Sequence, residues 1–237
     1  MLNLDVALSS LFVPHCAACD ERVAPATPLC PPCVGTLEPV GSACPRCGVA
    51  QAGGPANTCA TCRTTDWPLE SLVAPWQYGG ELARSLRRLK FSARPHLARD
   101  LAPLFAPFLA AVVEAGAIDV IVPVPLHARR LAARGFNQAD ALARHARRVA
   151  AVRTKVDGLA LRRTRATPPQ THLDGAARRA NLTGAFIVTH PRRVAGKRVL
   201  LLDDVIATGA TMGAAARALL VGGAAAVVGF ACARADR

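Results

Sequence analysis

The sequence has no long apolar run, few aromatic side chains and few lysines. The longest apolar segments, near residues 199–202 and 218–230, are broken by Asp203 or by glycines, so none is long enough to cross a bilayer. Residues 1–16 lack the basic head of a secretory signal peptide. These absences predict a cytoplasmic protein without a transmembrane segment. Aromatic residues make up only 4% of the chain, which leaves few platforms for stacking nucleic-acid bases.

Positive charge is scarce in one part of the chain and abundant in the other. Residues 1–62 hold two basic and four acidic residues, a net charge of −2, whereas residues 63–237 hold 27 basic and 12 acidic residues, a net charge of +15. All but three of the 29 basic residues are arginine, which suits bidentate phosphate contacts. A GC-rich coding sequence also explains many arginines, but explains less well their scarcity in the first 62 residues. The second part is expected to meet an anionic partner.

The pattern along the chain predicts two units. Residues 14–62 are rich in Cys, Pro and Gly, residues 63–78 form a bridge, and from residue 79 helical and strand-like patterns alternate. We expect helices at 81–91, over 96–116 with breaks at its prolines, at 137–150 with Asn137 as cap, and at 211–223, and strands at 117–125, 157–163, 185–189, 197–204 and 224–233. This alternation predicts an α/β fold with a mostly parallel sheet flanked by helices over 67–237, preceded by a small Cys-rich module over 1–66.

Eight of the nine cysteines form C-x-x-C pairs: Cys16 and Cys19, Cys30 and Cys33, Cys44 and Cys47, Cys59 and Cys62. Two such pairs can close a tetrahedral Cys₄ zinc site, so the pairs predict two structural zinc ions, with sequential grouping preferred over a cross-braced one. Gly48 allows the turn that lets backbone amides face sulfur. A disulfide framework and a redox C-x-x-C are the alternatives; a cytoplasmic location disfavours the first, and four tandem pairs disfavour the second. The lone Cys232 is expected to be a small core residue.

Residues 199–212, VLLLDDVIATGATM, bring two aspartates to the end of an apolar strand. Adjacent carboxylates repel each other and need partners or water, so a polar ligand is expected there. Two carboxylates can accept hydrogen bonds from neighbouring sugar hydroxyls. A glycine-containing loop at a helix N-terminus can present N–H groups to a phosphate. The alternative is an Asp pair that only caps the strand-to-helix loop.

This string resembles the 5-phosphoribosyl-1-pyrophosphate (PRPP) signature of type I phosphoribosyltransferases. The resemblance implies that Asp203 and Asp204 are catalytic residues that hold the ribose. The 5′-phosphate would lie on the loop formed by Ala207, Thr208, Gly209, Ala210 and Thr211.

Two basic segments agree in order with such a domain. A loop after the strand at 117–125 carries His127, Arg129, Arg130 and Arg134, which suit a leaving pyrophosphate; a solvated basic loop is the alternative. The polar segment 162–186 matches the flexible hood that closes over substrate and excludes water. It contributes the candidates Arg163, Gln170 and Arg179.

The combination of both units is more specific than either unit. Tandem C-x-x-C pairs precede VPVPLH, RGFNQA, RRANLTGAF and LLDDVIATGAT. On these motifs nearly the whole chain is similar to the ComF family of competence-related proteins, which includes GntX-like proteins. The resemblance implies a PRPP-dependent phosphoribosyltransferase with Mg²⁺, an unknown acceptor, and a role in DNA uptake or the use of external DNA. Two other functions stay open: a competence factor that binds single-stranded DNA, and a regulator that senses PRPP without catalysis.

Overall fold

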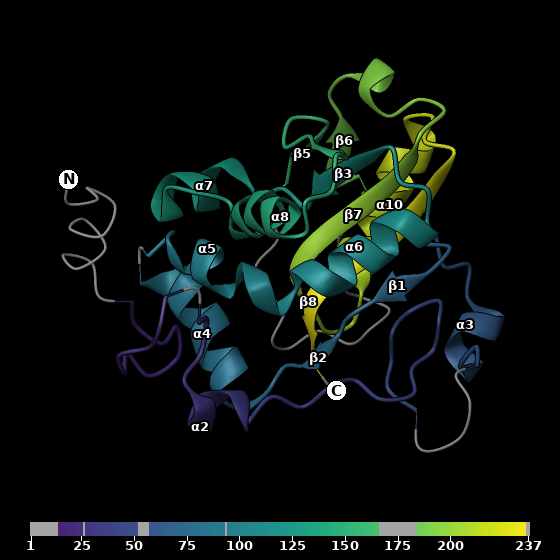
Figure 1. The fold of residues 1–237 in the computed structure, drawn as a ribbon. Coiled ribbons are helices and arrows are strands. Elements are labelled where there is room, and N and C mark those ends of the chain that lie inside the picture. The colour runs from purple at the N-terminus through teal and green to yellow at the C-terminus, as the bar shows by residue number, and fades with distance from the viewer. Residues whose placement is uncertain (1–13, 26, 52–56, 93, 166–183, 236–237) are drawn as a thin grey trace.

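A parallel β-sheet forms the centre of the molecule (Figure 1). The computed structural model describes residues 14–25, 27–51, 57–92, 94–165 and 184–235. The strands pair in the order β1-β8-β7-β3-β4, and β2 also pairs with β8. Every pairing in this sheet is parallel, as predicted. The strands are β1 (Leu72–Val73), β2 (Trp76–Gln77), β3 (Val120–Pro123), β4 (Lys155–Val156), β7 (Arg198–Ile206) and β8 (Ala226–Arg234).

Helices cover both faces of the sheet (Figure 1). Side chains alternate between the faces of a strand, so Leu200 and Leu202 of β7 pack with the helices on one side, whereas Leu201 packs with α10 on the other. Because both faces are covered, the central strands read as apolar runs, and all nine residues of β8 are buried. The described helices of the α/β part are α4 (Gly80–Phe91), α5 (Leu97–Leu101), α6 (Ala106–Ala115), α7 (Ala128–Arg134), α8 (Gln138–Val149) and α10 (Ala210–Val221).

The expected helix over 96–116 is interrupted, as its prolines predict. A 3-10 turn, η1 (Ala102–Leu104), separates α5 from α6, because proline lacks the N–H that a continuous helix needs. A second such turn, η2 (Pro191–Arg193), precedes β7. Asn137 caps α8 as predicted, since its side-chain oxygen accepts a hydrogen bond from the Ala139 N–H at 3.1 Å.

Three expectations about the elements are wrong. The expected strand at 157–163 is two strands: β4 joins the main sheet, and β5 (Leu161–Arg163) pairs antiparallel with β6 (Phe186–Val188). Between them Asp157 accepts a hydrogen bond from the Leu159 N–H at 3.0 Å, which turns the chain. The bridge at 63–78 contains β1 and β2 and so belongs to the sheet. The expected basic loop after β3 is largely helix α7, described below.

The Cys-rich part consists of two similar units. In each unit a hairpin carries the first C-x-x-C pair, closed by the bridges His15–Arg22 and Ala43–Ala50, and the second pair begins a short helix, α2 (Pro31–Val34) or α3 (Ala60–Thr64). We call these units the first and second ribbon. Each hairpin turns at a positive φ, +66° at Asp20 and +69° at Gly48; the glycine was expected to serve this turn.

Each ribbon packs on a different part of the α/β domain (Figure 1). The first lies beside α4 and shares a hydrophobic cluster with it, in which Cys16 and Leu29 join Leu86. The second lies beside β1, where the Leu72 N–H donates to the Pro45 carbonyl at 3.0 Å. The boundary between residues 66 and 67 stays a prediction about sequence units.

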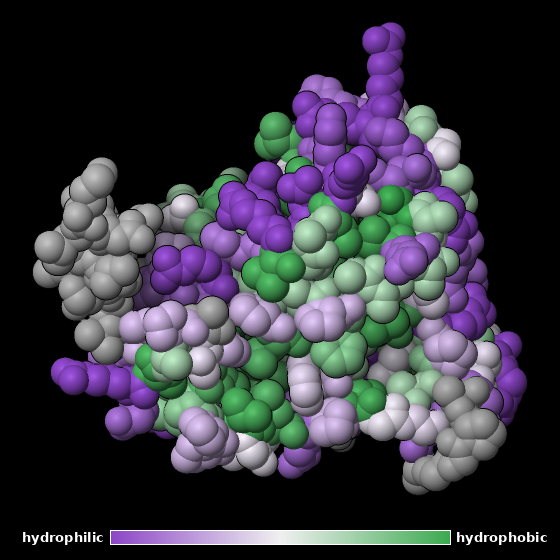
Figure 2. Space-filling model, viewed as in Figure 1, coloured by the Kyte–Doolittle hydropathy of each residue, from purple (hydrophilic) through white to green (hydrophobic). Residues whose placement is uncertain are grey.

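Figure 2 shows where apolar residues reach one face of the surface. Apolar residues gather near the centre of the face shown, over α6, and hydrophilic residues lie above them. Phe108 of α6 is 38% exposed and lies edge-on to Trp76. Within the described part of the chain, no helix combines the length and apolar character that a bilayer crossing requires.

Candidate functional site

Two acidic side chains lie near the carboxyl end of β7, next to the carboxyl end of β3. β7 continues to Ile206, so Asp203 and Asp204 lie inside the strand. Asp204 is 2% exposed, and its Oδ2 lies 2.6 Å from Lys90 Nζ on α4. Asp203 is partly exposed and accepts a hydrogen bond from the Asp204 N–H at 2.9 Å. The open end of a parallel sheet is the usual ligand position in α/β folds.

Burial and neighbouring charges change the pKa of Asp203 and that of Lys90, the partner of Asp204. Burial raises the pKa of Asp203 well above its ordinary value, and the neighbouring Asp204 charge raises it further. Burial would lower the pKa of Lys90, but the Asp204 carboxylate more than offsets this, so the pKa of Lys90 is raised. Lys90 therefore stays positively charged and neutralises one of the two acids.

Sequence reasoning assigned no role to Lys90. It is one of three lysines among 29 basic residues, and it lies in the last turn of a helix whose other polar residues are mostly arginine. That rarity is the only signal in the sequence, and rarity alone does not identify a partner more than a hundred residues away. The ion pair with Asp204 appears only when α4 packs on the sheet.

Two of the predicted arginines, on β5 and α7, interact electrostatically with the acid pair. Arg163 of β5 is 9% exposed and stacks over the Phe186 ring at 5.4 Å. Burial and the nearby Arg130 lower the pKa of Arg163, while the Asp203 charge raises it. Arg134 of α7 lies over the Phe91 ring at 5.4 Å, and burial lowers its pKa while the Asp204 charge raises it. The charge of Asp203 thus acts on Arg163, and that of Asp204 acts on Arg134.

The segment after β3 is a helix where a loop was expected. His127 begins α7, and its Nδ1 accepts a hydrogen bond from the Arg129 N–H at 3.3 Å. This cap and Gly135, with φ +81° at the other end, allow a short helix in a stretch whose many arginines suggested a solvated loop. Asn137 also donates to the Val124 carbonyl at 3.0 Å, which ties the start of α8 to the end of β3.

Of the other predicted residues of this region, the structure describes His127 and Arg129. His127 forms a bridge with Arg163, so β5 lies directly beside the start of α7. Arg129 is exposed on α7. Gln170 and Arg179 lie outside the described residues.

The predicted phosphate loop connects β7 to α10. Gly209 has φ +77° and stands at the N-cap of the 12-residue helix α10, a conformation that favours glycine. The Thr208 hydroxyl accepts a hydrogen bond from the Ala210 N–H at 3.4 Å. Ala207 is exposed, and Thr208 and Thr211 are partly exposed. The helix therefore directs its positive end toward the loop, as phosphate binding requires.

The cysteines form two four-sulfur groups in sequential order, as preferred. Within each group the Sγ atoms all lie within 4.8 Å of one another, and the groups are Cys16, Cys19, Cys30 and Cys33, and Cys44, Cys47, Cys59 and Cys62. Burial opposes ionisation of Cys16 and Cys44, but backbone N–H groups facing each sulfur lower the pKa of both to about 7. Four thiols in this arrangement fit tetrahedral zinc, so the chain has two Cys₄ sites compatible with two structural zinc ions. Cys232 is buried, as expected.

The fold and the site together define a phosphoribosyltransferase-type domain joined to a double zinc ribbon. Residues 108–237 match the family described as "Phosphoribosyl transferase domain", and residues 7–64 match the "Double zinc ribbon domain". The DNA utilization protein YhgH of Salmonella typhi is 34% identical over 84% of this chain and 87% of its own. Its counterpart in Escherichia coli K12 is 35% identical over the same shares. Competence protein F of Haemophilus influenzae is 29% identical over 66% of this chain and 69% of its own.

These matches cover both units of the chain, the C-x-x-C pairs and the LLDDVIATGAT segment included. The chain belongs to the ComF family.

Proposed function

We propose that this chain binds PRPP, together with Mg²⁺, at the carboxyl ends of β3 and β7 and transfers its phosphoribosyl group to an acceptor. The observation that carries the proposal is the acid pair of β7 followed directly by the glycine loop at the N-terminus of α10. Carboxylates for ribose hydroxyls and a helix N-terminus for a phosphate are therefore neighbours in the chain, at the carboxyl end of the sheet.

Each part of PRPP has a group of suitable chemistry. Asp203 and Asp204 accept hydrogen bonds from the ribose hydroxyls, and the loop from Ala207 to Thr211 holds the 5′-phosphate. Arg134 and Arg163, with His127 and Arg129 beside them, face the pyrophosphate. Arginine is the side chain best suited to that group, because it stays charged and bonds phosphate oxygens in pairs. Gln170 and Arg179 stay candidates for the hood.

The reaction is a displacement at the anomeric carbon. The bond from this carbon to the pyrophosphate oxygen breaks, a bond to the acceptor nucleophile forms, and the nucleophile loses its proton. Mg²⁺ bound with the diphosphate would neutralise charge on the leaving group, and oxygen donors such as the partly exposed Asp203 carboxylate are the ligands it prefers. The arginines stabilise the negative charge that develops on pyrophosphate.

The relatives point to a place in DNA metabolism. Relatives that match 84% of the chain are named DNA utilization proteins, and another is named a competence protein. We propose that this chain likewise serves the uptake or use of external DNA, in the cytoplasm, where PRPP is made.

A screen for pyrophosphate release tests the activity. The full chain is incubated with PRPP, Mg²⁺ and, in separate reactions, purines, pyrimidines and single-stranded DNA. We expect release with one acceptor class and none from Asp203→Asn/Asp204→Asn. Calorimetric titration with PRPP in the same buffer separates the alternatives. Binding without turnover on any acceptor would favour a PRPP-sensing regulator, and no binding by the wild type would contradict the proposal.

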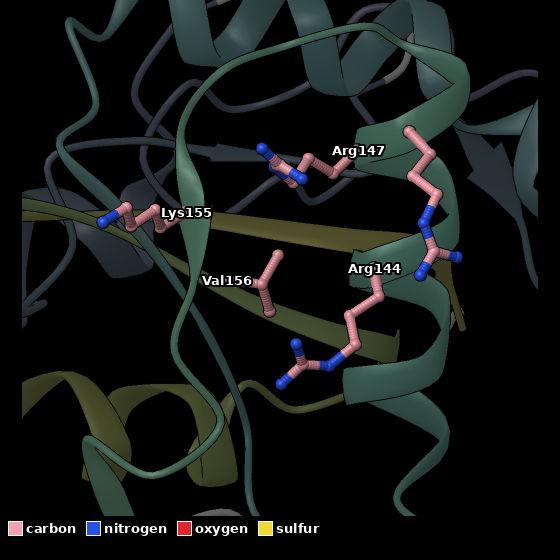
Figure 3. A pocket seen from close by; sticks show the side chains of 5 residues that line it. Arg144, Arg147, Lys155 and Val156 are labelled. Carbon is pink, nitrogen blue, oxygen red and sulfur yellow. The ribbon is translucent and has the colours of Figure 1, made fainter.

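A second function, binding of single-stranded DNA, is favoured by a basic groove between α8 and β4 (Figure 3). The groove has a volume of about 240 Å³ and is lined by Arg144, Arg147, Arg148, Lys155 and Val156. Arg144 and Arg147 extend from α8 toward β4, whereas Lys155 points away from the helix (Figure 3).

Two of these arginines bind groups within the protein. Arg147 donates to the Thr154 carbonyl at 2.7 Å, and Arg144 pairs with Asp140 at 2.8 Å. Arg148 and Lys155 are exposed. Four cations around one groove suit the phosphates of a nucleic-acid backbone.

A further inference from the structure

The second ribbon reaches the phosphate loop through one aromatic side chain, Trp67. A Cβ atom built on Gly209 would lie 2.5 Å from Trp67 Cη2, and one built on Gly213 would lie 3.3 Å from Trp67 Cζ3. The indole ring is therefore packed directly against the loop and the first turn of α10, at two positions that carry no side chain. Any displacement of the ring leaves this turn without its support.

The ribbon fixes Trp67 by reciprocal hydrogen bonds with Arg46. The indole N–H donates to the Arg46 carbonyl at 2.8 Å, and the Arg46 guanidinium donates to the Trp67 carbonyl at 2.9 Å. Arg46 stands between Cys44 and Cys47 in the sequence, and it also donates to the Cys62 carbonyl at 3.2 Å. Arg46 is thus fixed by both C-x-x-C pairs of the second ribbon, and Arg46 in turn fixes Trp67.

Two further contacts join the ribbon to the elements on either side of the loop. Arg234, at the end of β8, donates to the Cys47 carbonyl at 2.5 Å, and its register partner on β7 is Ile206, the residue just before the loop. Arg217 of α10 pairs with Asp66 at 3.1 Å. The second ribbon therefore contacts the strand beside the loop, the loop itself and the helix after it.

We propose that the second Cys₄ site positions the phosphate loop through Trp67, so that zinc in this site and a sugar phosphate on the loop bind with positive coupling. Trp67 is a positioning residue: it holds the Gly209 turn in the conformation that presents the loop to phosphate. The ligand in this inference rests on the proposed function, but the support of the loop by the zinc-loaded ribbon does not.

The first ribbon provides a matched comparison. It contacts α4, where Arg88 donates to the carbonyls of Ala17 and Ala18 at 3.1 and 2.8 Å and pairs with Asp20. Loss of zinc from the first site is therefore expected to disturb α4 and to leave the loop in place. Loss from the second is expected to disturb the loop.

The first experiment measures amide hydrogen exchange in the full-length, zinc-loaded chain. The Gly213 N–H donates to the Gly209 carbonyl at 2.8 Å, so its exchange rate reports on the turn that Trp67 supports. We expect roughly tenfold faster exchange over residues 207–213 in Trp67→Ala, a smaller increase in Trp67→Phe, and no change in Trp76→Phe, which removes the other indole of the chain. Cys44→Ser should loosen the same residues, and Cys16→Ser should not.

The second experiment titrates the same variants with ribose 5-phosphate, and with PRPP and Mg²⁺, by calorimetry. We expect Trp67→Ala to weaken binding roughly tenfold and Trp76→Phe to bind as the wild type does. Because coupling is reciprocal, saturating PRPP should slow the release of zinc from the second site to a chromogenic chelator, with little effect on the first.

The outcomes separate this inference from the proposed function. If wild type fails to bind PRPP, the proposed function fails, and hydrogen exchange alone decides the inference. If wild type binds and Trp67→Ala binds equally well, with exchange over 207–213 unchanged, the inference is wrong. A loss of thermal stability in Trp67→Ala with neither loop effect would show a structural role only, which also overturns it.

Discussion

At the scale of single residues, the site depends on placing two carboxylates together and neutralising one of them. Asp204 is buried against Lys90, while Asp203 keeps a raised pKa because of burial and the adjacent negative charge. Two adjacent carboxylates repel each other, so the pair that the proposed ribose contacts need lowers the stability of the folded protein. The acid pair is therefore a place where function and stability oppose each other.

Replacing Asp203 should stabilise the fold and abolish PRPP binding. The folded state binds this proton more tightly than the unfolded state, so the contribution of Asp203 to stability falls as the pH rises from about its ordinary pKa of 3.8 to the raised value in the folded state. We expect Asp203→Asn to raise the free energy of unfolding by about 1 kcal/mol at pH 7 and to flatten its pH dependence, while PRPP binding is lost. Urea unfolding at several pH values measures this. Unchanged or lower stability at pH 7 would contradict the electrostatic account.

Replacing Lys90 should have the opposite effect. Lys90→Met leaves the buried Asp204 carboxylate without its cation, and breaking a buried pair on one side costs about 3 kcal/mol. Adding Asp204→Asn removes the stranded charge, so the double variant should recover much of that loss. A double-mutant cycle in urea tests this. Additive losses would mean that the 2.6 Å contact contributes nothing to the fold.

At the scale of elements, the site is assembled by segments whose ends are well defined. Strand β7, the loop and α10 are continuous in sequence, and Asn137 caps α8. These features were predictable because each is local: an apolar run, a cap, a glycine at a turn. The ribbons were predictable for the same reason, since C-x-x-C spacing alone defines a zinc knuckle.

The features that the sequence did not reveal depend on packing between distant segments. Lys90 meets Asp204 and Trp67 meets Gly209 across more than a hundred residues, and no local pattern marks either pair. Strands β1 and β2 have two residues each, too few to show a period. Helix α7 was not predicted, because its arginines suggested a loop. Its cap, His127, is also a less common N-cap residue than Ser, Thr, Asp or Asn.

The two ribbons should bind one zinc ion each and contribute to folding. We expect about two zinc ions per wild-type chain, and one in either Cys16→Ser or Cys44→Ser, measured by release to a chromogenic chelator after denaturation. Because the metal holds each small unit together, both variants should melt at lower temperature than wild type, whereas Cys232→Ser should keep both zinc ions. Wild-type zinc content in either ribbon variant would contradict the two-site assignment.

At the scale of the whole molecule, charge separates the two units. The first 62 residues have a net charge of −2 and the rest +15, so an anionic partner is expected on the α/β domain. The basic groove of α8 and β4 lies on the edge strand of the sheet. A DNA strand and PRPP therefore have separate candidate sites on this domain.

Salt dependence tests the groove as a DNA surface. If Arg148 and Lys155 each contact a phosphate, Arg148→Ala/Lys155→Ala should weaken binding of single-stranded DNA. It should also lower the slope of log affinity against log salt by about 1 to 2. The control is Arg87→Ala, an exposed arginine on α4, which should leave the slope unchanged. Fluorescence anisotropy with a labelled oligonucleotide measures both. Equal slopes in all three proteins would exclude the groove.

The most direct test of the central claim is a crystal structure of the full chain with PRPP and Mg²⁺. The account predicts the ribose hydroxyls on Asp203 and Asp204, the 5′-phosphate on the backbone of residues 207–211, and the pyrophosphate toward Arg134 and Arg163. A structure obtained at saturating ligand in which this crevice is empty, or in which both carboxylates point away from a bound sugar, would contradict it.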